Sequence, residues 1–184
     1  MKDVSKLIED IYRTKGDLSY LGEGVSQIEH AWQCGQLAKK NSASSELQLA
    51  AWLHDIGHLL SKEGDTPTLK GHDDRHERIG SQFLKNLFPE AVFVPISLHV
   101  EAKRYLISTD ASYLEKLSPD SVRSLTLQGG PLSIEECQNF LSKPFAMDAI
   151  ALRRWDDQAK DSECSLPSKE EVLSELKDLT VSCS

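Results

Sequence analysis

Apolar residues recur every three or four positions through most of this sequence, the spacing that lines up side chains on one face of an α-helix. No stretch shows a convincing alternation of apolar and polar residues, which would mark a β-strand. The pattern therefore predicts an all-α protein folded as a helical bundle. The first such run follows Asp3, a residue type that often caps a helix N-terminus, and comprises Val4, Leu7, Ile8, Ile11 and Tyr12.

Several helix starts are marked by a serine with a glutamate or glutamine three residues later. In such a pair each side chain bonds the backbone N–H of the other residue. These pairs predict helices over the apolar runs that follow them, with loops between the helices. The pairs are Ser26 with Glu29, Ser45 with Gln48, Ser133 with Glu136 and Ser168 with Glu171, and the predicted loops cover residues 16–25, 61–74 and 128–131.

Glycine and proline predict further helix boundaries. Gly57 is expected to end the helix that Ser45 opens, so that His54 and Asp55 would share one helix. Pro89 is expected in the first turn of a later helix. Pro95 is expected to kink or break that helix, because proline lacks the backbone N–H that a helix interior uses.

The segment AAWLHDIGHLL, residues 50–60, places polar residues between two apolar runs. Burying an unpaired carboxylate costs several kcal/mol unless a metal or a hydrogen-bonding partner accepts it. Because neighbouring helical residues point about 100° apart, His54 and Asp55 could each hold one of two adjacent ions, with the carboxylate bridging them. The alternative for this pair alone is a core histidine beside a helix-terminal carboxylate.

Other potential ligands on separate predicted helices favour the metal interpretation: His30, His76, His99 and Asp156. Imidazole and carboxylate ligands without thiolates suit iron, manganese, zinc or magnesium. Helical bundles commonly build binuclear sites from side chains on facing helices. His72 lies in a polar loop and is expected to be an ordinary surface residue.

Composition narrows the function classes. A chain of 184 residues is expected to form one domain spanning 1–184, and its net charge of −8 argues against a nucleic-acid partner. Four scattered cysteines suggest a reduced, cytoplasmic setting. The sequence shows no run long and apolar enough for a membrane span. It makes no prediction of oligomeric state.

The order H…HD…H…H…D, from His30 to Asp156, resembles the HD-domain superfamily of binuclear metalloproteins. The segments LSYLGEGVSQIEH, LHDIGH, HVEAKRYL, QGGP and RRWDD are similar to a phosphonate-degrading branch of that superfamily, the mixed-valent di-iron oxygenases. The resemblance covers most of the chain except the loop from Ser61 to Arg75. It implies a cofactor of two iron ions, Fe(II)/Fe(III), with O2 as co-substrate and a small organophosphonate as substrate.

The same resemblance assigns roles to individual residues. It implies that Asp55 bridges the irons and that Tyr20 occupies an iron before substrate arrives, so that both are catalytic, while Glu23 moves with Tyr20. His99 and Lys103 lie one helical turn apart, which is consistent with an ammonium that points toward the metals. The implied iron ligands are His30, His54, Asp55, His76, His99 and Asp156, and the implied substrate contacts are Tyr20, Glu23, His58, Lys103, Ser121 and Arg153.

The reaction implied is oxidative cleavage of a carbon–phosphorus bond. The substrate expected is (R)-2-amino-1-hydroxyethylphosphonate, which would give glycine and phosphate. Only Tyr20 and Trp155 offer aromatic faces near the site, which is few for binding a trimethylammonium group. The 2-trimethylammonio analogue, giving glycine betaine, and hydroxymethylphosphonate remain alternatives. A metal-dependent HD phosphohydrolase and a non-catalytic regulatory HD module also remain alternatives.

The role of Arg153 has an alternative as well, because Arg153 and Arg154 could form surface ion pairs with Asp156 and Asp157.

Overall fold

Ten α-helices and no β-strand occur in the residues that the computed structural model describes, which are 3–20, 23–61 and 71–184. The all-α prediction is confirmed. Within the predicted loops, residues 21–22 and 62–70 lie outside the described residues. The elements are α1 (Val4–Lys15), α2 (Gln27–Lys40), α3 (Ser45–Leu53), α4 (Ile56–Leu60), α5 (His76–Leu84), α6 (Glu90–Thr109), the short 3-10 helix η2 (Leu114–Lys116), α7 (Pro119–Leu127), α8 (Ile134–Leu141), α9 (Ala146–Gln158) and α10 (Lys169–Ser182).

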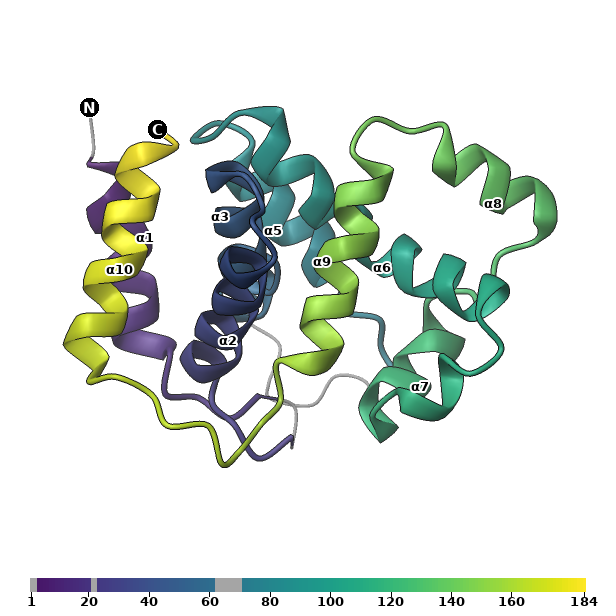
Figure 1. The fold of residues 1–184 in the computed structure, drawn as a ribbon, viewed down its shortest axis with the longest axis horizontal. Coiled ribbons are helices and arrows are strands. Elements are labelled where there is room, and N and C mark those ends of the chain that lie inside the picture. Colours follow the sequence, from purple (N-terminus) through teal and green to yellow (C-terminus); the bar gives the residue numbers. More distant parts are fainter. Residues whose placement is uncertain (1–2, 21–22, 62–70) are drawn as a thin grey trace.

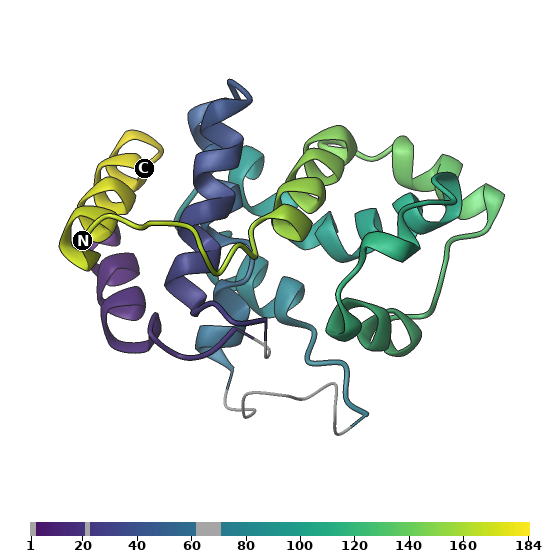
Figure 2. The same ribbon diagram turned by 60° about the horizontal axis from the view of Figure 1, so that its bottom comes forward.

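Helices α6 and α9 pack against each other in the middle of the molecule (Figure 1). On one side α2 and α3 lie beside α9 and α6, and the terminal helices α1 and α10 pack together at that end. On the other side lie α7 and α8, as the rotated view also shows (Figure 2). Both described chain ends therefore meet at one end of the molecule, far from α7 and α8.

The core consists of two clusters of buried apolar side chains, and α6 and α9 contribute to both. On α6, Ile96 belongs to the larger cluster and Ala102 to the smaller one, with His99 between them. On α9, Leu152 belongs to the larger cluster and Ala149 to the smaller one. The polar side chains of α6 and α9 therefore meet between the two apolar clusters.

Most predicted helix starts agree with the structure. The reciprocal hydrogen bonds predicted for three of the serine–glutamate pairs are present at α2, α8 and α10, and Asp3 caps α1. The prediction for Ser45 was wrong by one residue. Ser44 caps α3 through its hydroxyl, which accepts the Leu47 N–H at 3.2 Å. Serines occupy both positions, so the local pattern could not separate them.

The single helix predicted across His54 and Asp55 was also wrong. Helix α3 ends at Leu53 and α4 begins at Ile56, so Gly57 lies inside a helix and does not end one. Asp55 has φ −101° and ψ 11°, outside the helical region. The break changes the direction of the Asp55 side chain relative to a continuous helix, and both His54 and Asp55 are buried.

The predictions for the two prolines of α6 need correction as well. Pro89 is the N-cap, and the helix itself begins at Glu90. Helix α6 continues through Pro95 to Thr109, so of the predicted kink or break the break is wrong. Pro95 lies near the start of the helix, where the loss of one backbone hydrogen bond affects only the first turns.

The close packing of α4 on α5 depends on Gly57. A Cβ at this position would lie 2.0 Å from the carbonyl oxygen of His76. We expect Gly57→Ala to force α4 and α5 apart and to destabilise the protein by about 1–3 kcal/mol or more, as overpacking does. The same displacement should reduce metal binding, because His76 starts α5. Thermal unfolding and metal content would test this, and wild-type values for both would contradict it.

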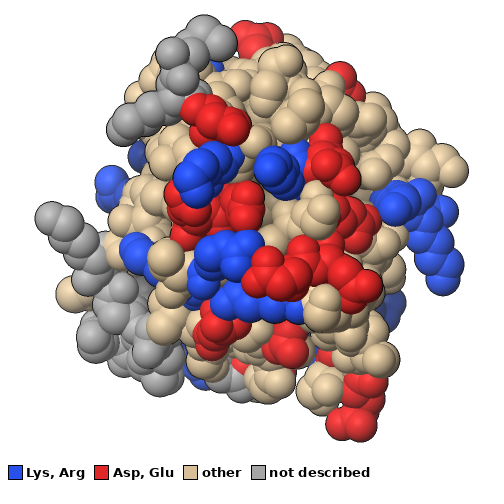
Figure 3. Space-filling model, turned by 90° about the vertical axis from the view of Figure 1, so that its left-hand side faces the viewer, with Lys and Arg blue, Asp and Glu red and all other residues tan. Residues whose placement is uncertain are grey.

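Charged side chains of both signs alternate over the end of the molecule formed by α1 and α10 (Figure 3). Arg13 pairs with Glu9 and Glu170 there, and Lys169 pairs with Asp17. The net negative charge therefore does not form a single acidic patch on this face.

Among the helices described, none has the length and apolar character to cross a membrane.

Candidate metal centre and substrate pocket

Two groups of buried side chains meet at Asp55. In the first group the Nε2 atoms of His30 and His54 lie 3.2 Å apart. Asp55 Oδ2 lies 3.3 Å from His54 Nε2, and Asp156 Oδ1 lies 3.4 Å from His30 Nε2. These four side chains come from α2, the α3–α4 junction and α9, so the fold brings together residues that are far apart in the sequence.

The second group shares the same aspartate. The Nε2 atoms of His76 and His99 lie 3.1 Å apart, and Asp55 Oδ1 lies 3.3 Å from His76 Nε2 and 3.7 Å from His99 Nε2. Asp55 Oδ1 is buried and has no hydrogen-bond partner. An orphaned carboxylate oxygen between two imidazoles is costly unless a cation binds there.

All four imidazoles are held through their other nitrogen. Nδ1 lies 2.8 Å from Ala159 O in His30, 2.9 Å from Ala51 O in His54 and 2.7 Å from Ile96 O in His99. In His76 it lies 2.9 Å from Asp74 Oδ1. Each Nδ1 must donate to these acceptors, so in the neutral ring, the form that binds a metal, Nε2 carries no proton and is directed at the site.

Unprotonated Nε2 atoms that face each other at 3.1–3.2 Å would repel without a cation between them. Metal–nitrogen bonds of about 2.0–2.1 Å place neighbouring ligand atoms about 2.8–3.4 Å apart, the shorter values in octahedral sites and the longer ones in tetrahedral sites. The spacings within each group match that range or slightly exceed it. The donor atoms therefore fit two metal ions, with one oxygen of Asp55 directed to each.

Tyr20 reaches into the first group. Its hydroxyl donates to Asp55 Oδ2 at 2.8 Å and lies 3.4 Å from Asp156 Oδ1, and its ring stacks on His30 with centroids 3.8 Å apart. Burial raises the pKa of Tyr20 well above its ordinary value, and the charges of Asp156 and Asp55 raise it further. The hydroxyl lies beside the donor atoms of the first group, where it would compete with a substrate oxygen.

A buried lysine marks the other side of the pocket. Lys103 is 2% exposed, and its Nζ donates to Ser124 Oγ at 2.7 Å and to the Ser121 carbonyl at 3.4 Å. Burial lowers the pKa of Lys103 to about 7, and the charge of Arg153 contributes to the decrease. Both hydrogen-bond partners of Lys103 in the described residues are neutral, and a buried ammonium with neutral partners is a strong site for an anion.

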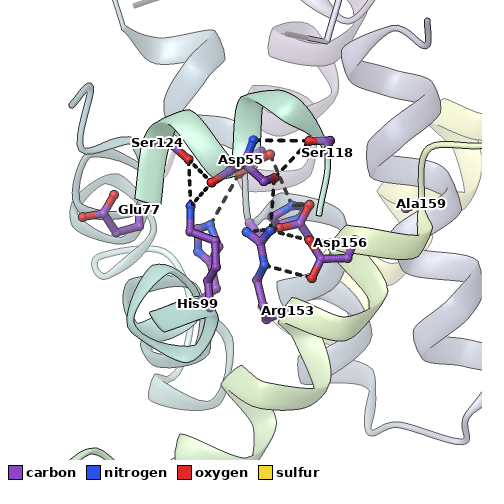
Figure 4. Close-up of polar contacts among 12 residues, drawn as sticks. Asp55, Glu77, His99, Ser118, Ser124, Arg153, Asp156 and Ala159 are labelled. Atoms are coloured by element: carbon purple, nitrogen blue, oxygen red, sulfur yellow. Dashed lines mark hydrogen bonds and ion pairs between the residues drawn. The ribbon is translucent and has the colours of Figure 1, made fainter. Parts of the chain in front are cut away.

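Arg153 pairs with Asp156 and Asp157, as one reading of the sequence suggested, but these ion pairs are buried and do not lie on the surface. Its Nη1 lies 2.7 Å from Asp156 Oδ2, and its other nitrogens contact Asp157 and Tyr113. In Figure 4 Arg153 points from α9 toward α7, which carries Ser124. Its Nη2 also lies 3.4 Å from Ser121 Oγ. Arg153 can therefore orient Asp156 while it faces the pocket.

His58 and His76 share one carboxylate. Asp74 accepts from His58 Nδ1 at 2.8 Å and from His76 Nδ1 at 2.9 Å, and the two rings stack with centroids 4.2 Å apart. Burial would raise the pKa of Asp74, but the hydrogen bonds from the two histidines outweigh it and hold that pKa far below its usual range. Asp74 is therefore a carboxylate throughout the neutral range.

Glu23 stands at the edge of the site. Its backbone N–H donates to the Tyr20 carbonyl at 2.8 Å, and its carboxylate lies 3.5 Å from Lys160 Nζ. Lys160 also reaches Ser118 Oγ at 3.3 Å. This lysine thus connects the segment of Tyr20 and Glu23 to the start of α7.

The structure brings together all the residues that the sequence proposed for the site, although three of them do not line the pocket: Glu23, His30 and His54. Trp155 belongs to the larger apolar cluster and is absent from the pocket lining in the described part of the chain. His72 is exposed, as expected. Sequence reasoning missed Asp74, Ser124 and Lys160. A carboxylate two residues before His76 was the available signal for Asp74.

The pocket between these groups is small. About 40 Å³ is open to the centres of water molecules, and one water needs about 10–15 Å³ on this measure. Its lining is polar and charged, and Val100 is the one aliphatic side chain that lines it in the described residues. The space suits a small, polar molecule, and Lys103 is where an anionic group would bind.

Comparison with known proteins agrees with this geometry. Residues 28–132 match the model of the HD domain, a range that includes five of the six proposed ligands and ends before Asp156. The chain is 44% identical to hydroxymethylphosphonate dioxygenase from Gimesia maris over 86% of this chain and 80% of that protein. It is 38% identical to [1-hydroxy-2-(trimethylamino)ethyl]phosphonate dioxygenase (glycine-betaine-forming) from Leisingera caerulea, over 90% of this chain and 88% of that protein. An uncharacterised protein of Acanthamoeba polyphaga mimivirus is 34% identical over 87% of this chain and 74% of that protein.

Proposed function

This chain belongs to the HD-domain family, and from that premise we propose that it is a dioxygenase that cleaves the carbon–phosphorus bond of a small 1-hydroxyalkylphosphonate. One observation carries the proposal. Asp55 belongs to two adjacent groups of side chains that can bind metal ions. A buried lysine, Lys103, lines the same small pocket as Asp55. Such a pocket can hold an anion directly beside two metal ions.

We propose iron for both metal positions, as a mixed-valent Fe(II)/Fe(III) pair. The donor set of imidazoles and carboxylates without thiolates supports this choice over a structural zinc site. His30, His54 and Asp156 would hold one ion, His76 and His99 the other, and Asp55 would bind both. When bound, the pair would supply the activation of O2 and the Lewis acidity that the substrate hydroxyl needs.

The protein's own residues bind and orient the substrate. Lys103 and His58 would bind the phosphonate through their N–H groups. Ser121 on α7 and Arg153 on α9 would make the remaining contacts to it. Tyr20 would leave its place beside Asp55 when the substrate hydroxyl arrives. Holding the reacting carbon in one position is worth several kcal/mol in such reactions.

The residues 1–184 would form one catalytic domain, because α6 and α9 contribute to both apolar clusters. We further propose a reducing, cytoplasmic setting, which the four free cysteines support.

The size of the pocket bears on the substrate. We propose 2-amino-1-hydroxyethylphosphonate, as the sequence suggested, with hydroxymethylphosphonate as the second candidate because the space is small. Asp73 lines the pocket and could receive an ammonium group. A trimethylammonium group would need more room and aromatic faces, and Tyr20 alone among the Tyr, Trp and Phe residues of the described chain lines the pocket.

A competition assay tests reaction and substrate together. The three hydroxyphosphonates would be compared by kcat/KM for phosphate release, with O2 uptake measured in parallel. We expect stoichiometric O2 uptake with at least one of them, and at least about a tenfold lower kcat/KM for the trimethylammonio compound, as about 1.4 kcal/mol of steric penalty would cause. Phosphate release from phosphomonoesters without O2 uptake would favour a phosphohydrolase and overturn the proposal.

A further inference from the structure

Asp74 lies between an imidazole of the metal centre and an imidazole of the phosphonate pocket. One of its oxygens, Oδ1, accepts from His76 Nδ1 at 2.9 Å and from the His76 backbone N–H at 3.3 Å. The other, Oδ2, accepts from His58 Nδ1 at 2.8 Å. The two oxygens thus serve two different histidines, and the side chain of Asp74 is only 7% exposed.

Both histidines are forced by this carboxylate to present Nε2 to the pocket. A carboxylate can only accept, so each Nδ1 must carry a proton. His76 Nε2 is then free beside Asp55 Oδ1, 3.3 Å away, and His58 Nε2 lies 4.0 Å from the same oxygen. The two rings are nearly parallel, at 20°, and both Nε2 atoms lie on the side of Asp55 because both Nδ1 atoms contact Asp74.

The local backbone is shaped for this contact. Arg75, between Asp74 and His76, has φ 51° and ψ 35°, the left-handed conformation that residues with a Cβ seldom adopt. Arg75 makes no side-chain cap for α5, and the carboxylate of Asp74 bonds the first backbone N–H of that helix instead. This turn folds Asp74 back toward the His76 ring. A disfavoured backbone conformation beside a site points to a function for the residue that it positions.

We propose that Asp74 is a positioning residue that fixes the metal-binding ring of His76 and the anion-binding ring of His58 in a single arrangement. The proposal rests on the proposed function only for the statement that His58 contacts a phosphonate. It links the second metal position to the phosphonate pocket through one carboxylate. Loss of either hydrogen bond should therefore affect one half of the site and spare the other.

Two substitutions of Asp74 separate these halves. Asparagine has one accepting oxygen and one donating amide, and the oxygen should stay on the His76 side, where it receives two hydrogen bonds. The amide then faces His58 Nδ1 as a second donor, so the hydrogen bond that orients the His58 ring is lost. We expect Asp74→Asn to keep about two metal ions per chain and to bind inorganic phosphate about tenfold more weakly. Asp74→Ala should also drop to about one metal ion per chain, because second-shell partners of metal-binding histidines typically contribute about 10- to 100-fold in metal affinity.

Metal content and phosphate binding by equilibrium dialysis are measured on metal-loaded protein without turnover. They therefore remain informative even if no hydroxyphosphonate is a substrate. Asp110→Asn is the matched control, since Asp110 accepts a backbone N–H two residues ahead, from Ser112 at 3.0 Å, in the same kind of turn but beside no histidine. It should leave both measurements unchanged.

A double substitution distinguishes positioning from general stabilisation. In the His58→Ala background, Asp74→Asn should weaken phosphate binding no further, because the two changes act on one contact. The proposal is overturned if Asp74→Asn and Asp74→Ala both retain wild-type metal content and phosphate affinity. It is equally overturned if Asp74→Asn lowers metal content, phosphate affinity and melting temperature together. The same holds if Asp74→Asn weakens phosphate binding as much in the His58→Ala background as it does in the wild type.

Discussion

Asp55→Ala is expected to lose both metal ions and to reduce activity by more than the roughly 10- to 100-fold typical of second-shell changes. The reason is that each oxygen of Asp55 faces a different pair of Nε2 atoms, within 3.3–3.7 Å. Without this carboxylate, neither group keeps a full set of ligands. Metal analysis and O2 uptake would measure the effect.

Asp55→Asn offers a sharper comparison, because asparagine keeps the shape but only one accepting oxygen. We expect it to bind one metal ion strongly at most and to remain inactive. Asp10→Ala, which removes a carboxylate from the exposed side of α1, should keep wild-type metal content and activity. An Asp55→Ala protein that retained two metal ions would refute the bridging role.

The helices were predictable because their signals are local. A serine and a glutamate three residues apart, as at Ser26 and Glu29, interact within one turn, and the structure forms the bonds that the sequence suggests. The break after Leu53 was not predictable in this way. It depends on where His54 and Asp55 must point, and that is decided by residues on α2, α6 and α9. Pro95 likewise carries a local signal for a break, but it lies near the start of α6 and the helix continues through it.

The candidate site could be predicted where residue type and order sufficed, and not where burial decides. The six proposed ligands stand out because histidines and aspartates recur on otherwise apolar helix faces. Arg153 next to Asp156 and Asp157 could equally have been a surface ion pair from sequence alone. Its burial follows from Tyr113, which comes from a distant segment and contacts both Arg153 and Asp157. Asp74 was missed because its two partners, His58 and His76, meet only after α4 packs on α5.

Lys103→Met is expected to weaken phosphonate binding strongly while it makes the protein more stable. A charge-assisted contact is worth roughly 1.5–3 kcal/mol, so affinity should fall about ten- to a hundredfold. Methionine is a long apolar side chain that can replace the buried lysine stem on α6, but it removes the buried charge. Replacing buried charges by apolar side chains is often neutral or stabilising by about 1–4 kcal/mol. If Lys103 had a purely structural role, Lys103→Met would instead lower the melting temperature and leave phosphonate binding unchanged.

The pH dependence follows from the depressed pKa of Lys103, about 7 in the folded protein against an ordinary value of 10.5. Between these values the unfolded chain binds more protons, so the stability of the wild type rises with pH in that window. The excess stability of Lys103→Met should therefore be largest below pH 7 and shrink as the pH rises toward 10.5.

Phosphonate binding changes in the other direction, because the ammonium of Lys103 is present below its pKa and lost above it. Wild-type kcat/KM should decline as pH rises through about 7, and Lys103→Met should lack that decline. Lys40→Met, at an exposed position on α2, provides the control and should leave both profiles unchanged. If Lys103→Met bound phosphonate with wild-type affinity, Lys103 would have no part in the anion site, whatever its effect on stability.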